Sequence, residues 1–317
     1  MARRTDRAFG NTMTDADLSA GASEYLTESL FISASDGLRL HVKTYRPLSA
    51  LGLPVVCLPG LTRTEADFEV LARHLASDAV RPRDVFALDY RGRGQSGYDP
   101  DWRNYNLAVE LADVVTVLTS LDIRRAVFIG TSRGGLLTMM LSATQPAFIA
   151  GAVINDIGPV IESKGLQRIK GYVGQMPPPK DYADGAAMLS RLFGAQFPTL
   201  LDEDWHAWST RSWAQTPDGL TARYDFSLGN TLNDLDPDQP IPTLWDQFDA
   251  LASIPIMAIR GGLSDLLSTE TVAMMRQRRP DLDVLVVPDQ GHAPLLAEAP
   301  VVKQINAFCR RCDDTKP

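Results

Sequence analysis

Short apolar runs alternate with longer segments of helical periodicity along most of this 317-residue chain. The apolar runs are Pro54–Leu58, Asp84–Leu88, Ala126–Ile129, Ala150–Ile154, Ile256–Ile259 and Asp283–Val287. The segments with apolar residues at three- and four-residue spacing are Glu65–Ala76, Tyr105–Leu121, Gly134–Thr144, Thr269–Gln277 and Leu295–Arg310. Uninterrupted apolar runs are typical of strands that are buried on both faces. The alternation therefore predicts an α/β fold, a mostly parallel sheet with helices on both faces.

Two regions depart from this alternation. Between Leu30 and Tyr45, two β-rich runs flank the turn signal Asp36-Gly37, which predicts an antiparallel hairpin and brings the expected sheet to eight strands. Residues 157–246 hold four of the five tryptophans and a triple proline but no buried strand pattern. We expect short helices and loops there, a helical cap inserted into the fold. The expected division is a polar tail at 1–24, a core at 25–156 and 247–317, and a cap at 157–246.

Composition excludes several classes of protein. Charged residues make up 22% and apolar residues 44%, so the chain is globular rather than disordered. The sequence lacks the roughly 18 consecutive apolar residues of a membrane-spanning helix. The net charge of −8 disfavours nucleic acid and anionic membrane surfaces as partners.

Location is predicted from the cysteines and from the first residues. Cys57, Cys309 and Cys312 are too few for a disulfide framework, which fits a reducing compartment. The C-x-x-C spacing of Cys309 and Cys312 lacks a second metal-ligand pair, so we expect plain thiols at a frayed helix end. No apolar segment follows the basic start at Met1, so no signal peptide is predicted and the expected location is cytoplasmic.

The strongest chemical signal is Gly130-Thr-Ser132-Arg-Gly134, placed between a predicted strand and a predicted helix. G-x-S-x-G at such a turn is the nucleophile elbow, in which a strained serine projects above the sheet. Small residues are needed two positions before and after the serine because the turn is tight. Ser132 is therefore the expected nucleophile, with negative charge developing near the helix N-terminus.

A serine hydroxyl needs a base to remove its proton during attack, and the chain has four histidines. His41 lies in the predicted hairpin, His74 on an early helix and His206 among the tryptophans of the insertion. His292 follows the last predicted strand in a glycine-containing loop, from which it can reach the carboxyl edge of the sheet. We therefore predict His292 as the general base.

The imidazole needs a carboxylate that fixes its tautomer and stabilises its cation. Asp265 follows a strand and stands 27 residues before His292, so the order Ser132, Asp265, His292 is the one expected for a nucleophile-elbow fold. Asp156, which follows the preceding strand, is the alternative, because it could reach the same imidazole. Asp265 is the preferred prediction.

The loop after the first parallel strand is expected to complete an oxyanion hole. Gly60 permits close approach of the backbone there, so the N–H groups of Leu61 and Arg133 are the predicted donors. Arg63 is a candidate for binding a substrate carboxylate, although a structural ion pair is the favoured interpretation. The candidate substrate-contacting aromatics are Trp205, Trp208 and Trp213, for which packing is the simpler interpretation.

Together these motifs resemble the α/β-hydrolase superfamily over roughly residues 30–308. The matching motifs are Pro59-Gly60, Asp89-x-Arg-Gly-x-Gly-x-Ser96, Gly130-x-Ser-x-Gly134, Gly261-x-x-x-Asp265 and Gly291-His292. The resemblance implies that residues 157–246 form a cap over the active site. One departure is Pro59, where many members carry a histidine that braces the oxyanion loop.

The expected activity is hydrolysis of carboxylic esters through an acyl-enzyme on Ser132, without metal or organic cofactor. Members of the superfamily that dehalogenate or open epoxides use an aspartate nucleophile, which Ser132 disfavours. Members that cleave C–C bonds of ring-fission dienols or open lactones keep a serine, so these activities are alternatives. A non-catalytic ligand receptor is the alternative from another class. The expected partner is a small, partly apolar ester, and the sequence leaves the oligomeric state open.

Overall fold

The computed structural model describes residues 24–233, 239 and 241–315. In this part of the chain, eight strands form one sheet in the order β1-β2-β4-β3-β5-β6-β9-β10. The strands are β1 (Tyr25–Ser33), β2 (Arg39–Pro47), β3 (Val55–Leu58), β4 (Val85–Asp89), β5 (Ala126–Thr131), β6 (Ile149–Asn155), β9 (Ile256–Gly261) and β10 (Asp283–Val287). β2 is antiparallel to β1 and β4, and the remaining pairs are parallel. The predicted mostly parallel, eight-stranded sheet is confirmed, whereas residues 1–23 of the predicted tail lie outside the described residues.

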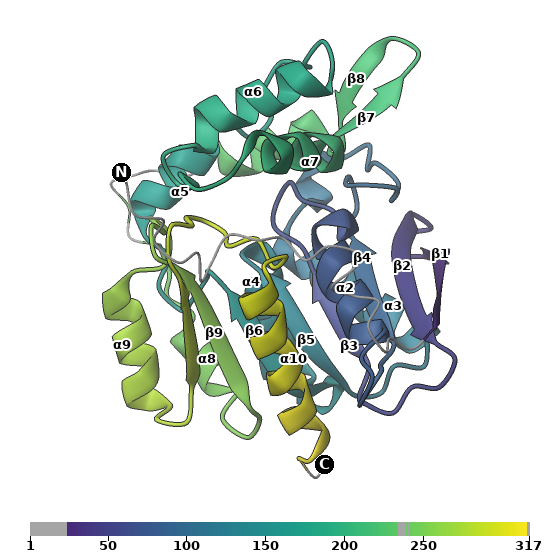
Figure 1. The fold of residues 1–317 in the computed structure, drawn as a ribbon, viewed down its shortest axis with the longest axis vertical. Helices are drawn as coiled ribbons and strands as arrows, with labels where there is room; N and C mark the ends of the chain where they lie inside the picture. Colours follow the sequence, from purple (N-terminus) through teal and green to yellow (C-terminus); the bar gives the residue numbers. More distant parts are fainter. Residues whose placement is uncertain (1–23, 234–238, 240, 316–317) are drawn as a thin grey trace, which may run out of the picture.

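Helices cover both faces of the sheet (Figure 1). The helices that pack on it are α2 (Glu69–Ala76), α3 (Leu107–Ser120), α4 (Arg133–Thr144), α8 (Trp245–Asp249), α9 (Thr269–Arg278) and α10 (Ala299–Asp313). Single-turn 3-10 helices η1 (Glu65–Phe68), η2 (Trp102–Asn104) and η3 (Pro146–Phe148) join these elements. The closing helix begins at Ala299, four residues later than expected, and η1 occupies the first turn of the segment predicted as a helix from Glu65.

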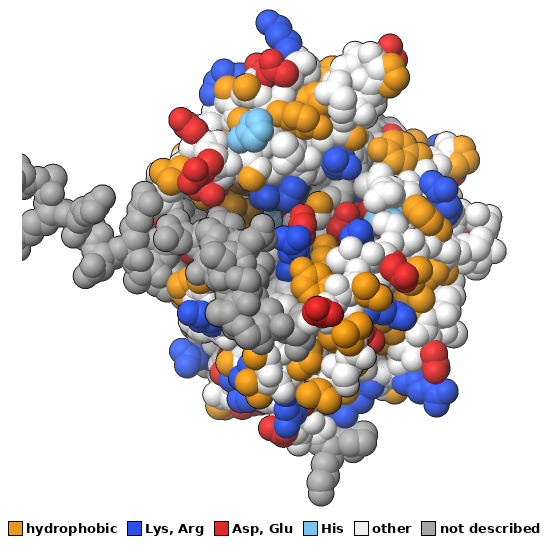
Figure 2. Space-filling view, turned by 45° about the vertical axis from the view of Figure 1, so that its right-hand side comes forward, with side chains coloured by type: hydrophobic (Ala, Val, Ile, Leu, Met, Phe, Trp, Pro, Cys, Tyr) orange, Lys and Arg blue, Asp and Glu red, His pale blue; other side chains and the backbone are white. Residues whose placement is uncertain are grey.

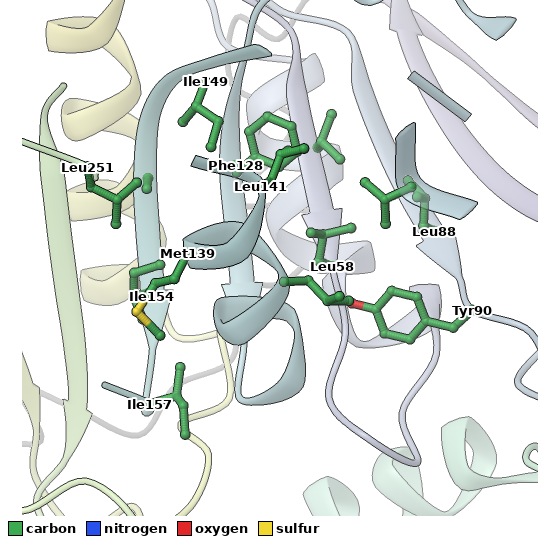
Figure 3. Packing of buried hydrophobic residues seen from close by; sticks show 14 of the residues in the cluster. Leu58, Leu88, Tyr90, Phe128, Met139, Leu141, Ile149, Ile154, Ile157 and Leu251 are labelled. Atoms are coloured by element: carbon green, nitrogen blue, oxygen red, sulfur yellow. The ribbon is translucent and has the colours of Figure 1, made fainter. Parts of the chain in front are cut away.

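Alternate residues of each central strand enter two separate cores, because successive side chains of a strand point to opposite faces. In β5, Ala126 and Phe128 face the core under α3, α4 and α8, whereas Val127 and Ile129 face the core under α2 and α10. Figure 3 shows Phe128 of β5 and Leu141 of α4 among the buried side chains of the first of these cores. The sheet is thereby a rigid layer buried from both sides, which fixes where its strand ends lie.

Residues 157–246, called the inserted segment below, lie between β6 and β9. The elements are α5 (Ser163–Lys170), α6 (Tyr182–Phe193), α7 (Asp202–Ser212), β7 (Trp213–Thr216), β8 (Gly219–Ala222) and η4 (Phe226–Leu232). Most of them lie together above the edge of the sheet where the parallel strands end (Figure 1). The antiparallel pair β7–β8 was not predicted, since its four-residue strands carry too little apolar periodicity to be seen in the sequence. α8, at the end of the inserted segment, packs against α4 in the core.

The three cysteines are free and buried. Cys309 and Cys312 lie on the inner face of α10, and Cys312 lies so close to Gly151 of β6 that a Cβ there would come within 2.3 Å of its sulfur. The expected frayed helix end is therefore wrong, because both thiols are core residues. No helix among the described residues is long and apolar enough to cross a membrane.

Candidate active site

Ser132 occupies a strained turn between β5 and α4. Its backbone has φ 51° and ψ −111°, and its N–H donates to Asn155 O of the neighbouring strand (2.9 Å). A Cβ on Gly130 would lie 2.4 Å from the backbone of Gly134, and a Cβ on Gly134 would lie 2.0 Å from Leu58 O. Both glycines are thus required by close backbone contacts, as the elbow motif predicts.

His292 reaches this serine from the loop after β10. Its Nε2 lies 2.9 Å from Ser132 Oγ. The loop is held in place by Asn155 Nδ2, which donates to Pro294 O (3.0 Å), and by Gln290, which accepts from the Leu295 N–H and donates to Glu298. The structure therefore brings Ser132 and His292 together within hydrogen-bonding distance.

Asp156 is the carboxylate that contacts the imidazole. Its Oδ2 lies 2.9 Å from His292 Nδ1, and the same carboxylate accepts from Ser264 Oγ (2.6 Å) and from the Gly261 N–H (2.7 Å). The residue is completely buried and has a φ of 55°, a conformation that aspartate and asparagine adopt more readily than most residues. Ser132, His292 and Asp156 form one hydrogen-bonded series, which we call the triad.

The preferred prediction of Asp265 as the orienting acid is corrected by this geometry. The carboxylate of Asp265 instead binds Arg168 of α5 through two hydrogen bonds of 2.7 and 2.9 Å. Burial alone would raise the pKa of Asp265, but the hydrogen bonds from Arg168 outweigh it and hold that pKa below its usual value. The reason is topological, because β6 lies beside β5, so Asp156 starts one strand from Ser132, whereas Asp265 stands four residues beyond the end of β9.

The other histidines lie away from the elbow. His41, in β2, is buried between Asp89 (2.7 Å) and Ser29 (3.0 Å), a second Ser–His–Asp arrangement near the β1 edge of the sheet. His74 lies on α2 and His206 on α7. Among the described residues, His292 is the histidine hydrogen-bonded to Ser132, in agreement with the elimination made from the sequence.

The loop after β3 lies directly beside the nucleophile. A Cβ on Gly60 would lie 3.9 Å from Ser132 Cβ, and Leu61 lines the same cavity as Ser132. Tyr90 donates its hydroxyl proton to Pro59 O (3.2 Å), and Arg93 Nε donates to Leu61 O (2.8 Å). These two side chains brace a loop that lacks the histidine found there in many α/β hydrolases.

A cavity of about 130 Å³ lies between the inserted segment and the triad. Its polar floor includes Ser132 and His292. Its apolar lining comes largely from the inserted segment and includes Ile169, Tyr172, Val173, Met176, Leu189, Phe193, Trp208, Trp213, Ala222, Tyr224 and Phe226. Figure 2 shows basic and acidic side chains gathered where the inserted segment meets the core. The cavity suits a small ligand with an apolar portion above the serine.

Of the four residues predicted as substrate contacts, three line the cavity and one does not. Trp208 and Trp213 line the cavity, whereas Trp205 is not among its lining residues and stacks on Trp208 at 5.4 Å between ring centroids. Arg63 lines the cavity, lies over the Trp208 ring and binds Asp67 through two hydrogen bonds of 2.5 and 2.7 Å. The ion pair favoured for Arg63 is therefore present, and its guanidinium also lies at the cavity.

Two residues that support the triad were missed by the sequence analysis. Ser264 donates to Asp156, and Asn155 donates both to Pro294 O and to Thr131 Oγ1 (3.1 Å). A lone serine in a loop and an asparagine at a strand end carry no signal of such roles. Asn155 does directly precede Asp156, so a polar pair after an apolar strand is the one hint that the sequence offers.

A serine elbow beneath an inserted helical segment, at the carboxyl edge of a mostly parallel eight-stranded sheet, defines the class of α/β hydrolases. The chain belongs to the alpha/beta hydrolase family, whose model matches residues 55–304. The fold and the predicted superfamily are thereby confirmed, and hydrolysis is the activity of the class.

Individual relatives of known sequence or structure are hydrolases too. The chain is 32% identical over 277 residues to a 3-hydroxybutyrate-oligomer hydrolase of Cupriavidus necator, which covers 84% of this chain and 92% of that protein. It is 25% identical to a 2-(acetamidomethylene)succinate hydrolase of Mesorhizobium japonicum, over 74% of this chain and 79% of that protein. The crystal structure of an α/β hydrolase from Novosphingobium aromaticivorans superposes with a TM-score of 0.83 at 38% identity, covering 91% of this chain and 99% of the other.

Proposed function

We propose that the protein hydrolyses carboxylic esters through an acyl-enzyme on Ser132. The observation that carries the proposal is the triad itself, in which two contacts of 2.9 Å link the Ser132 hydroxyl to His292 and His292 to a buried carboxylate. A base within this distance can take the hydroxyl proton as the oxygen attacks the acyl carbon.

The two ring nitrogens of His292 have separate tasks. Nδ1 donates to Asp156, which leaves Nε2 as the acceptor for the Ser132 proton and fixes the productive tautomer. After attack, the imidazolium donates that proton to the leaving alcohol. A water molecule then attacks the acyl-enzyme with His292 again as base, and the proton returns to Ser132 Oγ as the acid leaves.

The oxyanion formed in each half-reaction is assigned to the N–H groups of Leu61 and Arg133. Arg133 is the first residue of α4, where a backbone N–H has no acceptor within its helix. Leu61 lies on the braced loop after β3 and lines the same cavity as Ser132. Loss of one such donor typically lowers kcat by about 10²–10³-fold.

The substrate class is inferred from the cavity and from the relatives. Apolar side chains of the inserted segment, acting as a cap, surround the space above Ser132, and Arg63 places a cation at its wall. The 3-hydroxybutyrate-oligomer hydrolase, 92% of whose length this chain covers, acts on oligomers that are short esters with a terminal carboxylate. Small hydroxyacyl esters are therefore the proposed substrates.

The test combines active-site labelling with turnover. A fluorophosphonate probe should label Ser132 in the folded protein, and the protein should hydrolyse p-nitrophenyl butyrate and the 3-hydroxybutyrate dimer. Ser132→Ala should abolish both labelling and turnover. An unlabelled, folded protein would contradict the serine mechanism and favour a non-catalytic ligand receptor.

The alternatives within the enzyme class use the same triad. Lactones and ring-fission dienol acids, offered beside the two esters, separate a lactone or C–C hydrolase from an esterase. A kcat/KM for either alternative substrate that exceeds the ester values by an order of magnitude would overturn the ester assignment while leaving the triad in place.

A further inference from the structure

Glu110 is a completely buried carboxylate that lies between two arginines of the active-site region. It belongs to α3, and its oxygens lie 2.8 Å from Arg93 Nη1 and 2.5 Å from Arg133 Nε. Arg93 is itself completely buried, and the side chain of Arg133 is 13% exposed. Arg93 belongs to the glycine-rich motif after β4, which contributes no residue to the triad itself.

Each arginine is connected to one of the two proposed oxyanion-hole donors, Leu61 or Arg133. Arg93 Nε donates to Leu61 O. It thereby holds the peptide group that follows Leu61, the residue whose N–H is one proposed donor. Arg133 carries the other proposed N–H on its own backbone, and its side chain also donates to Tyr105 O (3.1 Å). A single carboxylate therefore connects the loop after β3, through Arg93, with the start of α4.

Both contacts of Glu110 are ion pairs with arginine side chains. Burial alone would raise the pKa of Glu110, but Arg133 and Arg93 outweigh it and hold that pKa below its usual value, so the carboxylate is ionised. Charge-assisted hydrogen bonds in a buried site are short and directional, and removal of one partner leaves a buried charge uncompensated. Small displacements of an oxyanion donor are costly because the hole acts by preorganisation.

We infer that Glu110 is a positioning residue that sets the spacing between the Leu61 and Arg133 amides through Arg93 and the Arg133 side chain. This inference rests on the proposed function, since it concerns the oxyanion formed on Ser132. Glu110 does not touch the substrate, and its effect reaches the reacting atoms through the two arginines.

The test is Glu110→Gln, which keeps the shape of the side chain but removes its charge. We expect kcat for p-nitrophenyl butyrate to fall at least tenfold with KM within twofold. The inhibition constant of butylboronic acid should rise by a similar factor, because its tetrahedral adduct on serine places an oxygen in the oxyanion hole. Arg133→Gln, which removes one connection and leaves Glu110 paired with Arg93, should give a smaller fall in kcat.

Asp113→Asn is the matched control. Asp113 lies three residues further along α3, is buried, and binds Arg91 through two hydrogen bonds of 2.7 and 2.8 Å. Because Arg91 also binds Asp36 and Asp99, the control loosens a buried ion pair of the same helix without touching Glu110. Its kcat and its boronic acid affinity should stay within twofold of the wild type, even where urea unfolding shows lost stability.

The outcomes separate the inference from the proposed function. If Ser132→Ala is inactive and Glu110→Gln and Arg133→Gln both keep the kcat and boronic acid affinity of the control, the positioning role is refuted while the esterase stands. Equal losses in the Glu110 and Asp113 variants would also refute it, since they would show a general effect of α3. Activity that survives in Ser132→Ala would instead overturn the proposed function.

Discussion

The carboxylate of Asp156 and the imidazole of His292 are joined across 2.9 Å, although 136 residues separate them in the chain. Asp156→Asn would place an amide opposite Nδ1, which removes the charge that stabilises the imidazolium and permits the wrong tautomer. We expect kcat to fall by about 10³–10⁴-fold with little change in KM. Steady-state hydrolysis of p-nitrophenyl butyrate measures this. A loss smaller than tenfold would show that Asp156 is not the orienting acid.

Asp265 has a different task, because it joins the core to α5 of the inserted segment through Arg168. Asp265→Asn should loosen the roof of the cavity, so we expect KM to rise about three- to tenfold while kcat falls by less than tenfold. Arg168→Gln should give the same pattern, since it breaks the same ion pair. A collapse of kcat in Asp265→Asn, with normal KM, would return Asp265 to the role of acid.

Ser29 provides an internal comparison for Ser132. It also has a histidine and an aspartate behind it, His41 and Asp89. It lies within strand β1, however, with no helix N-terminus after it to receive an oxyanion. We expect fluorophosphonate to label Ser132 alone, so Ser29→Ala should label and turn over as the wild type does. Peptide mapping by mass spectrometry tests this. An adduct on Ser29 would show that a neighbouring histidine is enough to make a serine react with the probe, without an oxyanion site.

Arg63 should distinguish anionic from neutral esters. Its guanidinium lines the cavity, and a charge-assisted hydrogen bond to a substrate carboxylate contributes about 1.5–3 kcal/mol. Arg63→Gln is therefore expected to raise KM for the 3-hydroxybutyrate dimer about tenfold and to leave KM for p-nitrophenyl butyrate within twofold. Equal changes for the two substrates would indicate that Arg63 acts only through its ion pair with Asp67.

Glu65 should make the stability depend on pH. Burial and the neighbouring charge of Asp89 raise the pKa of Glu65 from 4.5 to about 8. The folded protein therefore keeps a proton that the unfolded chain releases, so the free energy of unfolding falls as the pH rises from about 4.5 to 8. Glu65→Gln should remove this slope and add on the order of 1–3 kcal/mol of stability at pH 8. Urea unfolding at pH 5 and pH 8 measures how the free energy of unfolding changes with pH. A pH dependence that is the same in Glu65→Gln and the wild type would contradict the prediction.

The sheet, the elbow and the contact of His292 with Ser132 could be predicted from the sequence because each depends on a local pattern: apolar runs, glycine spacing and a histidine after the last strand. The choice between Asp156 and Asp265 depends on the strand order and on which of the two carboxylates is already paired with another side chain. Arg168, which occupies Asp265, comes from the inserted segment, and nothing local in the sequence indicates that pairing. Glu110 was missed for a related reason, since a glutamate on an amphipathic helix is ordinarily exposed, and only the tertiary structure encloses it between two arginines.

β10 lies at one edge of the sheet, where β9 is the strand paired with it in the part of the chain that the structure describes. Ser132 and Asp156, the proposed nucleophile and acid, follow β5 and β6 in the middle of the sheet, whereas His292, the proposed base, lies on the loop that leaves β10. Two members of the triad thus follow central strands of the sheet, and the third follows an edge strand. Under the proposed mechanism, an opening confined to β10 and its loop would take His292 away from Ser132 and stop hydrolysis, even with the central strands still folded.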